Sequence, residues 1–314
     1  MSAPFTFTLF QAILMLLLSP LLGGLIKNWK AKLQNRRGPP IGQSYSDLVK
    51  FLRKDMVISE HASWIFSATP YIIFLSVLVS ALLVPTVFVE APLSQFGGAI
   101  ALVGLLALGR FFLALAGLDP ATPFGGMGSS REMSLSSIAE PALMLSIFTV
   151  AISAGSTDLS RIVAHAAQAS WPLLDPATVL AFVALFIVVI AETGRVPVDN
   201  PATHLELTMI HEAMLLEYSG RHLALLEWAA SLKQLVLMTL LANVFFPTGI
   251  AREPTWAALL PSMIFFLAKL AALAGVVVLV ETTNAKLRLF RVPELLSGAF
   301  ILAAIALLST FIFQ

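Results

Sequence analysis

The chain has 314 residues, of which 58% are hydrophobic and only 12% are charged, and its formal net charge is +1. That balance excludes a generally basic nucleic-acid-binding protein, so we expect no nucleic-acid partner. Cysteine is absent from the whole sequence, which excludes disulfides, thiolate-bound iron–sulfur clusters and a thiol nucleophile in this chain.

Long apolar stretches recur along the chain, and each is long enough to cross a bilayer core of about 30 Å as a helix. They predict an all-α, polytopic membrane protein, with residues 1–314 forming a single integral membrane domain. We expect about eight transmembrane helices, at residues 5–26, 65–89, 96–117, 135–154, 177–194, 222–246, 256–283 and 293–313. The lipid bilayer is thus the first predicted partner.

Basic residues are distributed unevenly over the loops between these spans, and basic loops favour the cytoplasmic side. If the basic run after the first span is cytoplasmic, the outside loops contain only Arg161 and Arg252. Both termini are then predicted to lie outside. The cytoplasmic loops contain fourteen basic residues: Lys27, Lys30, Lys32, Arg36, Arg37, Lys50, Arg53, Lys54, Arg131, Arg195, Arg221, Lys286, Arg288 and Arg291.

The segment after the first span turns at Gly38-Pro39-Pro40 and continues into an amphipathic pattern at about 43–57. Apolar residues from Tyr45 to Val57 recur near helical spacing, and basic residues occupy another face. This pattern predicts an amphipathic helix at the cytoplasmic interface, with a basic linker attracted to anionic lipid as the alternative.

A Gly- and Pro-rich segment separates the third span from the fourth. It ends in Ser129-x-x-Glu132, a capping-box pattern that predicts the start of the fourth helix. No strand precedes the glycines at 125, 126 and 128, so we expect them to pack against a neighbouring loop rather than to bind phosphate.

The charged cytoplasmic loop at about 195–221, between the fifth and sixth spans, is the strongest functional signal. Charge beside hydrocarbon is costly and is retained mainly where it binds something, moves protons or holds a partner. Further ionisable residues lie inside the apolar stretches, including Glu140, Glu192, Lys233, Lys269 and Glu281. A carboxyl group at low dielectric can exchange protons near neutral pH, although each such residue could instead belong to a structural ion pair.

Histidines at 204, 211 and 222 lie in or beside this loop. His211-Glu212 is not followed by a histidine at position 215, so the zinc-protease spacing is absent. We therefore predict no metal site and no catalytic residue in this chain.

Three segments together resemble one family. GRVPVDNP followed by LEYSG resembles the cytoplasmic loop of the complex I subunit 1 family, a membrane component of NADH:quinone oxidoreductase, and QNRRGPP resembles that family's motif after the first span. RLFRVPELL before the last span is a weaker third match. FFLALAGLDPATPFGGMGSSREMSLSSIAEP and LKQLV are more similar to the membrane anchor subunits of hydrogenase-4, formate hydrogenlyase and related group 4 nickel–iron hydrogenases.

The resemblance implies roles for particular residues. Arg37, Gly38 and Pro39 would shape the mouth of a cavity that faces a hydrophilic arm, and the docking interface would also include Arg36, Asp47 and Lys50. A proton-coupling charged funnel, which would lead to antiporter-like membrane subunits, is expected to contain Arg131, Glu140, Glu192, Arg195, Asp199, Glu206, Glu212 and Glu217, with Lys233 and Lys269 added because they are ionisable residues within spans.

Three functions fit these observations. The first is the membrane anchor and proton-coupling subunit of a group 4 nickel–iron hydrogenase or formate hydrogenlyase-type complex in a bacterial or archaeal cytoplasmic (inner) membrane. In that case nickel–iron and iron–sulfur centres would belong to hydrophilic large and small partner subunits, and this chain would hold no cofactor. The second is the quinone-site subunit of a complex I-like NADH dehydrogenase. The third is a stand-alone proton-coupled carrier, for which a site near the bilayer midplane is expected.

Overall fold

The computed structural model describes residues 5–168, 175–199, 209–253 and 255–313, and these residues are helical apart from turns, loops and one isolated bridge between Phe88 and Ala251. The predicted all-α class is confirmed. Seven described helices have the length and apolar composition of a membrane span. They are α1 (Phe5–Leu33), α3 (Trp64–Leu83), α4 (Ala99–Leu118), α5 (Pro123–Ser153), α9 (Gly220–Phe245), α10 (Trp256–Thr283) and α11 (Val292–Phe313).

An eighth apolar helix, α7 (Pro176–Glu192), has 17 residues, which is the lower end of the range that crosses a bilayer. The shorter elements are α2 (Gln43–Arg53), α6 (Leu159–Gln168), α8 (His211–Leu215) and the 3-10 turns η1 (Ser94–Phe96) and η3 (Leu289–Arg291). All eight predicted spans therefore correspond to helices, and the chain is a multi-pass membrane protein.

Three helix boundaries differ from the predicted ones. The helix predicted to start near 135 begins at Pro123. Proline is favoured in the first turn of a helix, where its missing N–H costs nothing. The first turns of α5 also pack directly on α4, because a Cβ atom on Gly125 would lie 2.2 Å from the Gly117 carbonyl oxygen. Ser129 and Glu132 consequently lie inside α5 and do not form a capping box. The first span continues as α1 to Leu33, and α3 ends at Leu83, shortly before Pro85.

The amphipathic helix predicted at about 43–57 is shorter than expected. Helix α2 ends at Arg53, and its C-cap residue Lys54 has an extended backbone. Val57 is held in the following loop because both its backbone N–H and its carbonyl oxygen hydrogen-bond to the Ser219 hydroxyl, at 2.8 and 3.0 Å. Helix α2 itself has no buried residue and packs on α1 and α9.

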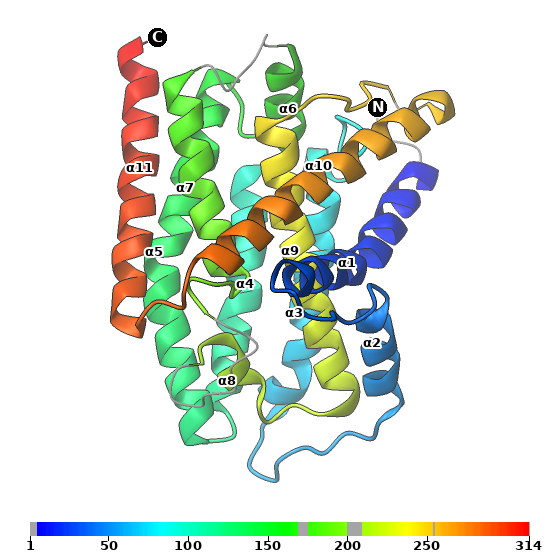
Figure 1. Cartoon of the computed structure of the whole chain (residues 1–314), viewed down its shortest axis with the longest axis vertical. Coiled ribbons are helices and arrows are strands. Elements are labelled where there is room, and N and C mark those ends of the chain that lie inside the picture. The colour runs from blue at the N-terminus through cyan, green and yellow to red at the C-terminus, as the bar shows by residue number, and fades with distance from the viewer. Residues whose placement is uncertain (1–4, 169–174, 200–208, 254, 314) are drawn as a thin grey trace.

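The bundle is built around α9. Every residue of α9 from Gln234 to Phe245 is buried, which is typical of a helix surrounded by neighbours. Helices α3 and α4 pack against each other, α3 also packs on α9, and α5, α7 and α11 form the opposite side. Helix α10 crosses the bundle obliquely in front of α9 (Figure 1). The outer faces of α10 and α11 expose large apolar side chains, as expected of surfaces in contact with lipid or another membrane subunit.

Candidate functional site: a buried charge network beside a cavity

The centre of the site is Arg110 on α4, which is only 5% exposed. One terminal guanidinium nitrogen donates to both carboxylate oxygens of Glu192, the last residue of α7, at 2.6 and 2.5 Å. The other terminal nitrogen donates to Glu140 on α5. The Nε atom lies 3.3 Å from a carboxylate oxygen of Glu132, also on α5, within ion-pair distance. One buried arginine thus binds three carboxylates from two neighbouring helices.

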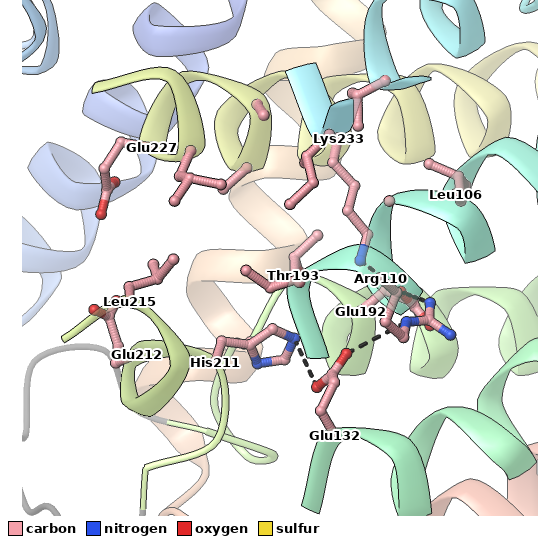
Figure 2. A pocket seen from close by; sticks show the side chains of 18 of the residues that line it. Leu106, Arg110, Glu132, Glu192, Thr193, His211, Glu212, Leu215, Glu227 and Lys233 are labelled. Atoms are coloured by element: carbon pink, nitrogen blue, oxygen red, sulfur yellow. Dashed lines mark hydrogen bonds and ion pairs between the residues drawn. The ribbon is translucent and has the colours of Figure 1, made fainter. Parts of the chain in front are cut away.

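Two further residues extend this arrangement. Lys233 on α9 lies 2.7 Å from Glu192, and the Nε2 atom of His211 on α8 lies 3.3 Å from Glu132. Figure 2 shows the chain of contacts from His211 through Glu132 and Arg110 to Glu192 and Lys233. We call these residues, together with Glu140, the Arg110 network. It joins helices α4, α5, α7, α8 and α9.

The Arg110 network contains three carboxylates but only two residues, Arg110 and Lys233, that are ordinarily cationic. With His211 neutral, one formal negative charge is left over. Uncompensated charge is costly at membrane depth and is usually a sign of function, which makes the Arg110 network the main candidate site.

A cavity of about 160 Å³ borders the network, which is space enough for several water molecules. Arg110, Glu132, Glu192, His211 and Lys233 contribute to its wall. Glu212 and Glu227 lie across the cavity from Arg110 (Figure 2). The remaining wall is largely apolar and includes Ile73, Val77, Leu106, Leu113, Leu215 and Leu226.

A second cluster lies around Glu281, near the end of α10. Its carboxylate contacts Lys30 of α1 at 2.7 Å and Arg195 at 3.0 Å, and Arg195 also donates to Gln234 of α9 at 2.7 Å. Nearby, Asp199 contacts Lys286 at 2.7 Å and accepts a hydrogen bond from the Ile210 backbone N–H at 3.1 Å. In the part of the chain that the structure describes, no group of three metal-ligating side chains could hold a metal ion.

The structure brings together several of the residues predicted for the charged funnel. Glu140, Glu192 and Lys233 belong to the Arg110 network, Glu212 and Asp199 line the cavity, and Arg195 belongs to the Glu281 cluster. Others lie elsewhere. Arg131 donates to the Met209 carbonyl oxygen at 2.9 Å, Glu217 is exposed, and Glu206 lies outside the described residues.

Lys269 is separate from the funnel. Its ammonium group donates to the side-chain oxygen of Asn243 at 2.6 Å and to the Phe246 carbonyl oxygen at 3.1 Å. Phe246 is the C-cap of α9, where a cation is stabilised by the helix dipole. Asn243 is ten residues beyond Lys233 on the same helix, about 15 Å along its axis. The contacts of Lys269 are those of a residue that caps α9.

The residues predicted for arm docking lie at the other end of α9, around the end of α1 and along α2. Arg36, Arg37, Pro39 and Lys50 are exposed, whereas Gly38 is half-buried against α1. The Asp47 carboxylate accepts a hydrogen bond from the Gln43 side chain at 2.9 Å, one turn earlier on α2. Helix α2, which carries Asp47 and Lys50, lies in the same half of the bundle as α8 (Figure 1).

Comparison with known proteins decides the family. The family model described as NADH dehydrogenase matches residues 5–312, almost the whole chain. The chain belongs to the NADH dehydrogenase family. This family includes subunit 1 of complex I, as the three sequence motifs predicted.

Two relatives in this family are formate hydrogenlyase subunit 4 and hydrogenase-4 component C, both of Escherichia coli (strain K12). The first is 36% identical over 304 residues, with 96% of this chain and 97% of the relative covered. The second is 37% identical over 302 residues, with 96% and 94% covered. A subunit of the membrane-bound sulfane sulfur reductase, an archaeal respiratory membrane complex, has the same fold, with a TM-score of 0.83, 21% identity and coverage of 96% and 99%.

Key residues of the site in this NADH dehydrogenase family member were not predicted from its sequence. Arg110 is not singled out by the sequence patterns, Glu132 is predicted as part of a helix cap, and His211 is considered only as a metal ligand. Lys30 and Lys286 serve only as basic loop residues that indicate the orientation in the membrane. The signal that could have found them was the arginine itself, because an arginine inside an apolar helix requires carboxylate partners from other helices.

Proposed function

We propose that this chain is the membrane anchor and proton-coupling subunit of a group 4 nickel–iron hydrogenase or formate hydrogenlyase-type respiratory complex. The observation that carries the proposal is the Arg110 network, in which three buried or half-buried carboxylates face two basic residues inside a membrane bundle. The identity of 36–37% to subunits of two such complexes over nearly the full chain supports the type of complex.

In this proposal a hydrophilic arm docks on the exposed surface that contains Arg36, Arg37, Pro39 and Lys50. The arm comprises large and small hydrogenase-like subunits, which hold the nickel–iron and iron–sulfur centres. This chain has no cysteine with which to bind a cluster. A redox-linked change of charge at the interface would alter the proton affinity of the ionisable side chains that line the cavity, because charges interact strongly at low dielectric. The Arg110 network would then bind or release its proton toward antiporter-like membrane subunits.

The proposal places α2, α8 and the docking surface on the cytoplasmic side of a bacterial or archaeal inner membrane. The uneven distribution of basic residues supports this orientation. Both termini are then outside the cytoplasm.

The function is tested by neutralising Glu140 and Glu192 one at a time to glutamine in the complete complex. Glutamine keeps the size of the side chain and removes the titratable charge. We expect the complex to assemble, and the number of protons moved per turnover in inverted membrane vesicles to fall several-fold. Glu294→Gln, which neutralises an exposed carboxylate on the first turn of α11, is the matched control. Unchanged proton movement in both network variants would contradict the proposal.

A quinone-site subunit is the second candidate, because the cavity has an apolar wall of Ile73, Val77, Leu106, Leu113 and Leu226 beside its charged groups. A quinone ring needs such a combination of apolar surface and a few polar contacts. Extraction of quinone from the native complex discriminates between the two functions. Stoichiometric quinone that is lost in a Val77→Trp variant would favour the quinone site. The stand-alone carrier is the least supported function, since both E. coli relatives are components of larger complexes by name.

A further inference from the structure

The Glu281 cluster connects two regions that the proposed function treats separately. One is the segment 34–42, which contains four of the six predicted docking residues (Arg36, Arg37, Gly38 and Pro39) and which we call the docking segment. The other is the Arg110 network. We propose that Glu281 is a positioning residue that couples the placement of the docking segment to the geometry of the Arg110 network. This inference rests on the proposed function.

The first step is the binding of Glu281 by two cations. Its side chain is 3% exposed, and each carboxylate oxygen contacts a different partner, Lys30 at 2.7 Å and Arg195 at 3.0 Å. Lys30 belongs to the last turn of α1, and Arg195 follows α7. Breaking a buried ion pair is costly, so these two ion pairs hold the three segments relative to one another.

The second step joins Lys30 to the docking segment. The docking segment folds back on the end of α1, where the Asn28 side chain donates to the Pro39 carbonyl oxygen at 2.8 Å. A Cβ atom on Gly38 would lie 2.9 Å from the Ala31 Cβ, and one on Gly24 would lie 2.1 Å from the Ile41 carbonyl oxygen. Asn28 and Ala31 flank Lys30 on the same helical turn. Movement of the docking segment therefore moves Lys30.

The third step joins Arg195 to the Arg110 network. The guanidinium nitrogen of Arg195 that does not contact Glu281 donates to Gln234 on α9. Gln234 is the residue next to Lys233, and Lys233 binds Glu192. The Arg195 backbone N–H also donates to the Ile190 carbonyl oxygen at 3.0 Å, which attaches Arg195 to the end of α7 two residues before Glu192. Displacement of Arg195 therefore acts on both Glu192 and its cationic partner.

The segment after α10 strengthens this connection. Lys286 binds Asp199 at 2.7 Å, and the Leu287 backbone N–H donates to the Pro197 carbonyl oxygen at 2.9 Å. Together with Glu281 and Arg195, these contacts tie residues 281–287 to residues 195–199 at three points. Side-chain contacts, together with neighbouring residues on α1 and α9, thus connect the docking segment through Glu281 to Glu192.

The test breaks the connection at Lys30, the more exposed of the two cations that bind Glu281. Lys30→Gln removes one cation from Glu281 and leaves Arg195 in place, so the chain should fold and the complex should assemble. We expect the redox turnover to be retained and the number of protons moved per turnover to fall several-fold. Lys30→Arg, which can still bind the carboxylate, should restore the ratio. Lys32→Gln is the matched control, because Lys32 is an exposed lysine in the same last turn.

Measuring Glu192→Gln in parallel with Lys30→Gln distinguishes a failure of this inference from a failure of the proposed function. If Glu192→Gln lowers the ratio and Lys30→Gln does not, the inference is wrong and the proposed function stands. If Lys30→Gln, Glu192→Gln and Glu140→Gln all leave the ratio unchanged, the proposed function and the inference both fail. If Lys30→Gln prevents assembly, Glu281→Asp is measured in its place. This variant keeps the negative charge on a shorter side chain, and we expect it to lower the number of protons moved per turnover. A wild-type ratio in Glu281→Asp would overturn the inference.

Discussion

Arg110 is the common ion-pair partner of three carboxylates. Replacing it with methionine would keep an apolar chain of similar length and leave Glu132, Glu140 and Glu192 without their common cation. Removing one partner of a buried ion pair typically costs about 3–5 kcal/mol. We therefore expect Arg110→Met to lower the abundance of the assembled complex strongly, and the thermal midpoint of the purified complex with it. Arg161→Met is the control, because that side chain is 77% exposed; equal effects of the two substitutions would refute this role.

The same residues show what a sequence can and cannot predict. Glu140, Glu192 and Lys233 were predictable because each is an ionisable group within an apolar stretch. Their grouping around Arg110 was not, since Arg110 and Glu192 are 82 positions apart and meet only when α4 and α7 pack in one bundle. Lys269 is the opposite case, because its position in the sequence and its contacts in the structure indicate different roles. Its position in mid-span indicated function, whereas its contacts with Asn243 and Phe246 are those of a helix cap.

At the scale of helices, two adjacent glycines of α1 provide a matched pair. A Cβ atom on Gly24 would lie 2.1 Å from the Ile41 carbonyl oxygen, whereas one on Gly23 would meet nothing within 4 Å. Gly24→Ala should displace the docking segment and lower the fraction of complexes that retain the hydrophilic arm, while Gly23→Ala should behave as wild type. Co-purification of the arm with the membrane subunit measures this fraction. Equal retention in the two variants would show that the docking segment does not pack on α1 as described.

Helix positions were predictable from apolar runs, but several ends were not. The sequence predicts the start of α5 near 135 because Gly and Pro usually mark loops, yet Gly117 and Gly125 are small residues that allow α4 and α5 to approach closely. The end of α2 is not visible in the local pattern, because the Ser219 hydroxyl that binds Val57 is 162 positions away. Such ends are set by contacts between distant segments, which periodicity does not show.

At the scale of the whole molecule, the orientation in the membrane is directly testable because the chain is naturally free of cysteine. We expect Ser46→Cys on α2 to react with a membrane-impermeant thiol reagent only from the cytoplasmic side. Thr157→Cys, just after α5 at the opposite end of the bundle, should react only from outside. Both positions are exposed. Labelling of the two cysteines from one side would contradict the proposed topology.

The central claim is that the Arg110 network carries a proton that moves during turnover. Infrared difference spectroscopy of the complete complex, between its oxidised and reduced states, measures this most directly, because protonated and ionised carboxyl groups absorb at different frequencies. We predict a redox-linked carboxyl change in the wild-type complex that is lost or shifted in Glu140→Gln or Glu192→Gln and kept in Glu294→Gln. A carboxyl difference spectrum identical in the wild type and in both network variants would contradict the claim.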